Sequence, residues 1–454
     1  MEQKIRLSQC MIVKNEEKNL RRALSWGRDI MWEQIVVDTG STDRTVALAE
    51  QMGAKVYHFP WVDDFAAAKN YALEQAQGDW IVFLDADEYF LPEDAGKLVP
   101  LLEELQDSGF HAVTAGWIQI DEDTDVLQSR KEGKLEWLRT ARADGGGGFS
   151  LAGTQVRIFR NQPGLRYQGR IHEKLCMAGG QVRCMDAGRE LSILHTGYSA
   201  AEMKEKKKTE RNIALIRQEI AQHPHDYKLL IYLGDSYFQQ KNYKEAAHCY
   251  ETAVLYLPED LGEDNIQGAM LFKHLLLIYM ESGEYEAAAE AYEKGTARFP
   301  KEADYDYLAG RGCTYGGRFR EGAFYLQRAL GLLERYGSES RSALLAHNLL
   351  EAWELLIRCD CENGDLQQCV SRAVTVLRAA PYTCGVLKNM LMSFRKDEEA
   401  NQGKAASALQ VRMFLGNLYD LQKAADRRFV LEAAKDAGYD GLAALLENDV
   451  PEKS

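Results

Sequence analysis

The chain has 454 residues, which is too long for one ordinary hydrophobic core, so two or three domains are expected. Its content of 46% hydrophobic and 27% charged residues is typical of a soluble globular protein. The formal net charge of −14 argues against a nucleic-acid partner, because neutralising phosphates requires clustered Lys and Arg side chains.

Three features of the sequence bear on the cellular compartment. The nine cysteines show neither C-x-x-C pairs nor zinc-finger spacing, so we expect them to be reduced. No apolar run reaches the ~18 residues of a membrane helix, and the opening residues lack the apolar core of a signal peptide. We therefore expect a cytoplasmic protein. The one basic cluster, residues 204–211, is interpreted as a solvated helix face or linker.

The first part of the chain alternates between short apolar strands and amphipathic helices. The predicted elements are a strand at 7–13, a helix around 20–26, a strand at 34–38, a helix around 46–49 closed by Gly53, and then a strand at 54–59, a helix at 65–73 and a strand at 80–84. This alternation predicts right-handed crossovers and a doubly wound, largely parallel sheet.

The last of these strands, Trp80–Leu84, is apolar throughout and ends at Asp85 and Asp87. A parallel sheet binds ligands at the carboxyl ends of its strands, so both acids are expected in the binding crevice. In an extended chain residues two apart share a face, which would direct both carboxylates at one point. Such a pair favours a divalent cation holding a diphosphate. The alternative is that both acids only cap the helix expected near Pro92.

Two further side chains are candidates for nucleotide binding. Asp38 ends the second strand and is followed by small residues, an arrangement that suits a base or a ribose. Its alternative is a helix N-terminus, with Ser41 or Thr42 as the cap and Asp43 complementing the helix dipole. Lys69, on the helix before the central strand, faces the nucleotide in one interpretation and only solvent in the other.

Four segments occur in an order that characterises one enzyme family: MIVKNEE at 11–17, VDTGSTDRT at 37–45, AAKN at 67–70 and FLDADE at 83–88. This succession resembles the nucleotide-sugar half of family 2 inverting glycosyltransferases with the GT-A fold. The resemblance is strong over roughly the first ninety residues and weaker as far as Tyr198. It implies an α/β, Rossmann-like domain that uses a nucleotide-sugar, with Mn²⁺ or Mg²⁺ as cofactor.

The resemblance also implies roles for individual residues. Asp38 would contact uracil or its ribose, Lys69 would neighbour the base, and Asp87 would bind the metal. The donor-binding set it implies is Val13, Asn15, Glu16, Asp38, Lys69, Asp85 and Ala86. Many relatives have an aromatic residue beneath the base where this chain has Val13 and Lys14, so the nucleotide is better indicated than its base.

Beyond the central strand, alternating segments predict strands at Phe110–Ile120 and Gln155–Arg160. Between them, Asp121–Phe149 lacks a regular pattern and is interpreted either as a loop that closes over the substrates or as a plain linker. Inverting transfer needs a carboxylate base for the acceptor's proton, and Glu173 is the best-placed candidate.

Two histidines complete the candidate site. By the resemblance, His195 is a metal ligand near the end of the transferase domain. His172, next to the candidate base, would contact a phosphate or hydrogen-bond a residue that itself binds the metal or the donor. The alternative for either histidine is a satisfied core or interface residue.

After residue 211 the pattern becomes purely helical and fits the tetratricopeptide (TPR) template, whose period is about 34 residues. The first two fits are carried by Leu230, Leu233, Gly234, Tyr237, Tyr243, Ala246, Tyr250, Ala253 and Pro258, and by Phe272, Leu275, Tyr279, Gly283, Tyr285, Ala288, Tyr292 and Pro300. The expected domains are a GT-A domain at 1–200, a helical linker at 201–225, a TPR solenoid at 226–382 and a helical cap or oligomerisation region at 383–454.

This pairing of domains resembles bacterial transferases that glycosylate Cys, Ser or Thr of secreted peptides. We therefore expect a metal-dependent inverting hexosyltransferase that moves a sugar, with UDP-sugar as the favoured donor, to a peptide or protein held by the concave face of the repeats. The alternatives are a glycan or cell-envelope glycosyltransferase, an interaction scaffold with a degenerate transferase domain, and repeats that only dimerise the enzyme. Nucleotidyl transfer is disfavoured because the opening loop lacks the glycines and lysines that bind a triphosphate.

Overall fold

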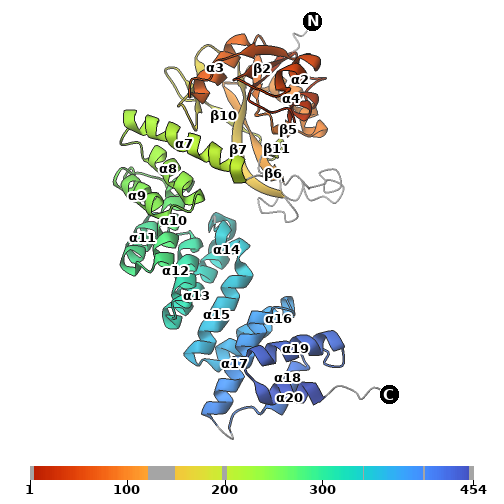
Figure 1. The fold of residues 1–454 in the computed structure, drawn as a ribbon, viewed down its shortest axis with the longest axis vertical. Coiled ribbons are helices and arrows are strands. Elements are labelled where there is room, and N and C mark those ends of the chain that lie inside the picture. Colours follow the sequence, from red (N-terminus) through yellow and green to blue (C-terminus); the bar gives the residue numbers. More distant parts are fainter. Residues whose placement is uncertain (1–4, 121–148, 197–201, 341, 402–403, 449–454) are drawn as a thin grey trace. The chain divides into compact units, whose positions relative to one another are not determined.

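The computed structural model describes residues 5–120, 149–196, 202–340, 342–401 and 404–448, and the chain forms two compact units, Met1–Ser236 and Tyr237–Ser454 (Figure 1). The loop expected at Asp121–Phe149 lies outside the described residues except for Phe149, and Tyr198 lies outside them as well. Within the described ranges, no helix combines the length and the apolar character needed to cross a membrane. All nine cysteines are described, and all are free thiols.

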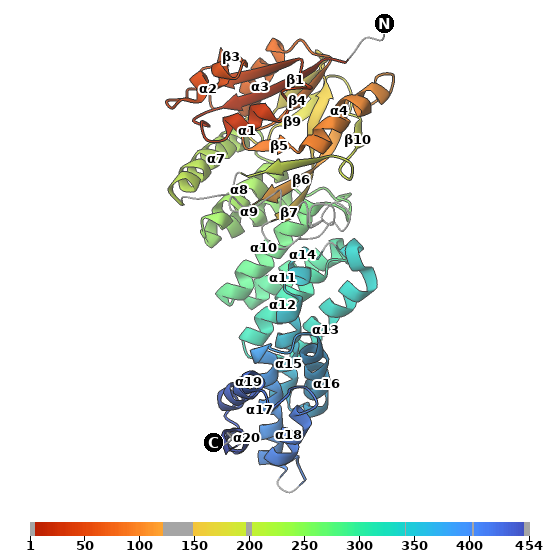
Figure 2. The same ribbon diagram turned by 90° about the vertical axis from the view of Figure 1, so that its right-hand side faces the viewer.

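The first unit is built on a mixed sheet with helices on both faces (Figure 2). Its elements are β1 (Leu7–Val13), α1 (Leu20–Ser25), β2 (Glu33–Asp38), α2 (Thr45–Gln51), β3 (Lys55–His58), α3 (Phe65–Gln75), β4 (Trp80–Phe83), β5 (Glu88–Phe90), α4 (Pro92–Glu104), β6 (Ala112–Ile120), β7 (Phe149–Arg160), β8 (Leu165–Gln168), β9 (Lys174–Met177), β10 (Cys184–Asp186), β11 (Ser192–His195), α7 (Glu202–Gln222) and α8 (Tyr227–Gln239). The predicted strands and helices of the first ninety residues are confirmed, with small shifts at their ends.

Strand order explains where the site lies. The main sheet runs β3-β2-β1-β4-β7-β6-β11-β5, with β10 beside β6. The strands β3, β2, β1 and β4 are parallel, as the crossovers predict, whereas β7 is antiparallel to both β4 and β6. The carboxyl ends of β1, β2 and β4 therefore meet at one edge, and that edge carries the predicted acids.

The two faces of the sheet are covered by different helices. Alternate residues of β4 point to opposite faces, because side chains in a strand alternate. Ile81 and Phe83 pack with Ala72 and Leu73 of α3. Trp80, Val82 and Leu84 share the opposite cluster with Leu98 and Leu102 of α4. The helices α1 and α2 cover the neighbouring part of that second face, over Met11 and Val36. All of β4 is thus buried, which fixes its carboxyl end firmly.

The second unit is helical and continues the repeats. Its elements are α9 (Tyr243–Leu255), α10 (Ile266–Ser282), α11 (Tyr285–Arg298), α12 (Ala303–Tyr315), α13 (Phe319–Tyr336), the short helix η1 (Gly337–Ser340), α14 (Ala343–His347), α15 (Leu349–Asn363), α16 (Leu366–Ala379), α17 (Cys384–Ala400), α18 (Ala408–Leu415), α19 (Ala424–Asp436) and α20 (Asp440–Asn448). Gly283 and Gly364 end α10 and α15 with φ of 79° and 78°, a left-handed conformation that favours glycine. Each of these helices then turns into its partner, so successive pairs follow one another along the unit (Figure 1).

Candidate active site

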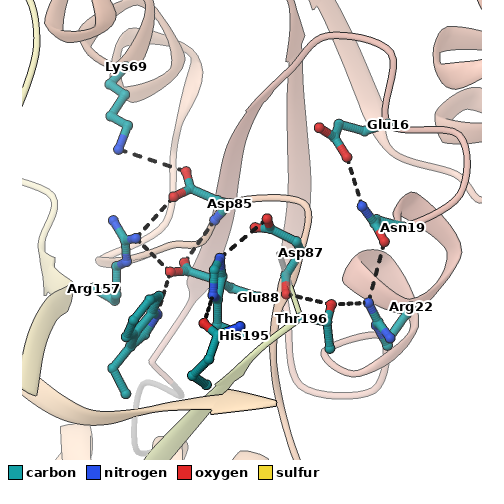
Figure 3. Close-up of polar contacts among 12 residues, drawn as sticks. Glu16, Asn19, Arg22, Lys69, Asp85, Asp87, Glu88, Arg157, His195 and Thr196 are labelled. Atoms are coloured by element: carbon teal, nitrogen blue, oxygen red, sulfur yellow. Dashed lines mark hydrogen bonds and ion pairs between the residues drawn. The ribbon is translucent and has the colours of Figure 1, made fainter. Parts of the chain in front are cut away.

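The two acids after β4 lie in a turn. The strand ends at Phe83, and the backbone N–H of Glu88 donates to the carbonyl of Asp85 at 3.0 Å. The expectation that Asp85 and Asp87 share a face of an extended chain is therefore wrong, and the two carboxylates reach different partners (Figure 3). The capping alternative is wrong as well, because Leu91 is the N-cap of α4 and no side chain caps that helix.

Asp85 lies between two cations. Its carboxylate is 3.9 Å from Nζ of Lys69 and 3.0 Å from Nη2 of Arg157. Burial away from water acts to raise the pKa of Asp85. The positive charges of Lys69 and Arg157 outweigh this effect and lower the pKa to about 2. Arg157 also pairs with the buried Glu88 at 2.6 Å, and Oε2 of Glu88 accepts the backbone N–H of Asp85. Asp85 is thus ionised and held in place from both sides.

Lys69 joins Asp85 to the candidate base. Its side chain is 4% exposed, and Nζ lies 2.6 Å from Oε1 of Glu173. The rings of Phe83 and Tyr167 lie near the ammonium group, at 5.1 and 5.2 Å from their centroids. The interpretation of Lys69 as a merely solvated lysine is therefore wrong. A buried cation with two carboxylate partners fixes the positions of both.

Asp87 and His195 form a second group beside the first. Oδ2 of Asp87 lies 3.3 Å from Nε2 of His195, and Nδ1 of His195 lies 2.6 Å from Oε1 of Gln119 (Figure 3). If a cation lay between Asp87 and His195, Nε2 would be its ligand and Nδ1 would donate its proton to Gln119. The backbone N–H of Thr196 also donates to the carbonyl of Asp87 at 3.1 Å.

These two side chains suit a divalent cation. A carboxylate oxygen is a ligand for Mg²⁺ or Mn²⁺, and a neutral imidazole nitrogen is a ligand for transition metals, so the pair could supply two ligands to a divalent cation. In the described part of the chain, no group of three or more His, Cys, Asp or Glu side chains could hold a metal ion. The remaining positions would therefore be filled by oxygens of a diphosphate or water.

The other donor-side candidates lie at the ends of β1 and β2. Val13 is opposite Asp38 in the parallel register. The carboxylate of Asp38 accepts the backbone N–H of Gly40 at 3.1 Å and of Ser41 at 3.0 Å. The backbone N–H of Asn15, which has a φ of 57°, donates to Oγ of Ser41 at 2.9 Å. These contacts tie the two strand ends into one surface.

Two more of the predicted donor residues are close to these groups. The backbone N–H of Glu16 donates to Oγ1 of Thr45 at 2.8 Å, and Ala86 is buried in the turn after β4. Ser41 and Thr42 do not cap α2, because its N-cap is Arg44. Asp43 does accept the backbone N–H of Thr45 at the start of that helix.

Glu173 is in the loop between β8 and β9, residues 169–173, hereafter the Glu173 loop. His172 of this loop has a φ of 52°, in the left-handed region, and the residue is exposed. Its ring stacks on Tyr232 of α8, with ring centroids 3.7 Å apart and an interplanar angle of 11°. The role of His172 as a phosphate contact or as a support for a ligand stays a prediction.

Three residues of the site were not predicted. Arg157, Glu88 and Gln119 contact the predicted acids or His195. Glu88 ends the FLDADE segment but was given no role there, and no motif marks Arg157 or Gln119. Arg157 carries the one available signal, since it is a charged residue within an otherwise alternating strand. A buried arginine in a strand requires a carboxylate partner, and Asp85 and Glu88 are such partners.

Comparison with known proteins identifies the two parts of the chain. Residues 8–161 match the model of glycosyl transferase family 2, and residues 227–260 and 274–302 match tetratricopeptide repeat models. The chain thus combines a family 2 glycosyltransferase domain with TPR repeats, and the predicted fold class is confirmed.

Several curated proteins are similar to this chain. A TPR repeat-containing protein of Synechococcus elongatus is 29% identical over 63% of this chain and 65% of its own length. The SPbeta prophage-derived glycosyltransferase SunS of Bacillus subtilis is 27% identical over 49% of this chain and 47% of its own length. An uncharacterized glycosyltransferase of Rickettsia felis is 45% identical over 18% of this chain and 29% of its own length. The chain spans less than two thirds of each of these relatives.

Proposed function

We propose that this protein is a metal-dependent inverting glycosyltransferase that moves a sugar from a UDP-sugar to a peptide or protein side chain. One observation carries the proposal: Lys69, in the segment that matches family 2, links Asp85 of the turn after β4 to Glu173, a carboxylate suited to act as the base. The similarity to SunS, a named glycosyltransferase, and the presence of TPR repeats support the same assignment.

The proposed division of labour follows from the contacts. Glu173 takes the proton of the acceptor's hydroxyl or thiol while that oxygen or sulfur attacks the anomeric carbon. The bond from this carbon to the diphosphate breaks, and the diphosphate leaves with the electron pair. Lys69 fixes the carboxylate of Glu173 so that its second oxygen can face the acceptor.

Charge around the site supports the proposal that a metal cation takes part. Lys69 and Arg157 face three carboxylates, those of Asp85, Glu88 and Glu173. These cations are therefore already neutralised before a diphosphate arrives. Asp87 and His195 would hold a divalent cation, which offsets the charge growing on the departing diphosphate.

The peptide acceptor is proposed from the repeats. One surface of the second unit, hereafter the α12 face, consists of Arg311 and Tyr315 of α12 and Glu351 of α15, and the buried Tyr307 of α12 lies beneath it. The three α12 residues recur every four positions, so they lie on one side of the helix. Glu351 accepts from both tyrosine hydroxyls, at 2.6 and 3.2 Å, and pairs with Arg311 at 3.4 Å. Ordered tyrosines and arginines are the residue types that most often anchor protein partners.

A direct assay tests this function. The full chain is incubated with Mn²⁺ and a panel of nucleotide sugars, and donor hydrolysis is measured together with the intact mass of candidate peptides. We expect metal-dependent consumption of a UDP-sugar and a mass increase of one hexose on a Cys-, Ser- or Thr-containing peptide. Calorimetry that finds no metal-dependent binding of UDP would contradict the proposal and favour a scaffold.

A further inference from the structure

We infer that Tyr232, on the first helix of the TPR region, is a positioning residue that holds the Glu173 loop through its stack on His172. The inference rests on the proposed function, because it assigns Tyr232 a role through the candidate base. All residues concerned belong to the first unit, Met1–Ser236. Tyr232 lies in the part of α8 that belongs to this unit. The helix begins at residue 227, where the first matched repeat also begins.

One side of the Glu173 loop is held by α3. The backbone N–H of Phe65 donates to the carbonyl of Arg170 at 2.8 Å. Asn70 exchanges two hydrogen bonds of 2.9 Å with the backbone of Tyr167, just before the loop. Lys69 holds the carboxylate of Glu173 itself. These contacts hold the loop at Arg170 and at Glu173.

Side chains of the loop also contact α7 and α8. Nε of Arg170 lies 3.2 Å from Oε1 of Glu219 on α7, and Glu219 is 12% exposed at its side chain. His172 stacks on Tyr232 of α8 almost face to face. Arg211 of α7 also lies over the ring of Phe65, whose amide bonds the loop. The two helices therefore contact the loop on both sides of Ile171.

The backbone of the loop makes this support necessary. His172 has a φ of 52°, and a left-handed conformation at a residue other than glycine persists only where surrounding contacts hold it. Glu173 follows directly, so any relaxation at His172 rotates the peptide that leads to the candidate base. A displacement of about 1 Å at a reacting group costs up to ~100-fold in rate. The stack is therefore placed where its loss affects chemistry more than donor binding.

The test uses the full chain with three substitutions. In Tyr232→Ala the stack is lost, and we expect kcat for transfer to fall about 10- to 100-fold while the donor KM changes less than about threefold. In Tyr232→Phe the ring remains, and we expect kcat within about twofold of wild type. Tyr227→Ala is the matched control, because Tyr227 lies on the same helix with its ring under Lys228.

A second readout does not depend on activity. Hydrogen exchange at the amide of Phe65, which bonds the loop, should be faster in Tyr232→Ala than in wild type or Tyr232→Phe. If the wild-type chain transfers no sugar, the proposed function is wrong, but this exchange comparison still tests whether Tyr232 holds the loop. Unchanged exchange in Tyr232→Ala, or equal loss of kcat in the Ala and Phe variants, would overturn the inference. If Tyr232→Ala does not fold, Glu219→Gln should show the same faster exchange at Phe65.

Discussion

At the scale of single residues, ion pairs between the charged side chains hold the site together. Lys69 is almost completely buried, yet its ammonium group contacts Asp85 and Glu173. Removing one partner of a buried ion pair leaves the other uncompensated, which is more costly than the pair is stabilising. Substitutions of Lys69 and its partners should therefore be conservative, so that an effect on activity can be told apart from a loss of folding.

Asp87→Ala tests the metal assignment. The carboxylate of Asp87 is 24% exposed and contacts His195, so the substitution removes little packing. We expect kcat/KM at saturating Mn²⁺ to fall by about 100-fold or more, because the ion loses a ligand and its offset of the diphosphate charge. Turnover is measured against Mn²⁺ concentration, and circular dichroism checks the fold. Asp29→Ala, at an exposed position, is the control. Wild-type turnover by Asp87→Ala at limiting Mn²⁺ would show that Asp87 is not a ligand.

Glu173→Gln separates catalysis from binding. The amide keeps the size of the carboxylate but cannot take a proton, so kcat should fall about 100- to 10,000-fold. Donor affinity, measured by calorimetry with UDP and Mn²⁺, should change far less, since the base acts on the acceptor in the transition state. A defect confined to donor binding would place Glu173 in the nucleotide site and leave the base unassigned.

At the scale of elements, the repeats depend on close approach between helices. A Cβ atom added to Gly310 of α12 would lie 2.7 Å from Cγ and 3.0 Å from the backbone N of Leu326 on α13. Such contacts force the two helices apart. The glycine is therefore required by packing, in agreement with the small residues that the TPR template expects.

Gly310→Ala should lower the free energy of unfolding by about 1–3 kcal/mol, because overpacking displaces α13. Gly331→Ala is the matched control on α13, where a Cβ atom would meet nothing within 4 Å. There the substitution should stabilise the helix by up to ~1 kcal/mol. Urea unfolding of both variants measures the two effects. Equal stability of the variants would contradict the close packing described for Gly310.

The elements of the first unit could be predicted because each carries its own periodicity. The run Trp80–Leu84 is apolar on both faces, as a strand between two helical layers requires. The placement of Asp38 and Asp85 at the carboxyl-end edge of the sheet also followed, since parallel strands end at one edge. The prediction that Asp85 and Asp87 point the same way was wrong, because no sequence pattern marks the turn that the Glu88 N–H closes.

Partners that come from distant elements could not be predicted. Arg157 reaches Asp85 because β7 pairs with β4 in antiparallel register, and strand order beyond the crossovers is set by the whole sheet. Nor does any local pattern specify that α7 and α8 pack on the Glu173 loop. A charged side chain in a strand or a histidine in a loop indicates that a partner exists, but the fold decides which one.

At the scale of the whole molecule, the sequence-based boundary and the structural units divide the chain differently. The expected transferase domain ended at residue 200, whereas the first compact unit extends to Ser236 and includes α7. Truncation shortly after residue 200 would thus remove Glu219 and Tyr232, which contact the Glu173 loop. Loss of transfer in such a fragment would not distinguish acceptor binding from a displaced base. Single substitutions in the full chain make that distinction.

Tyr315→Ala tests whether the α12 face binds the acceptor. Tyr315 is 59% exposed, and its loss removes an aromatic anchor while leaving Arg311 and Glu351 in place. We expect the KM for a peptide acceptor to rise about tenfold, since truncating an anchor costs ~1–2 kcal/mol of binding, with donor hydrolysis unchanged. Phe324→Ala is the matched control, because Phe324 is also 59% exposed but lies on α13 beside Tyr325. Steady-state kinetics with peptide and with water as acceptor measure both effects. Equal peptide KM values in the two variants would place the acceptor elsewhere.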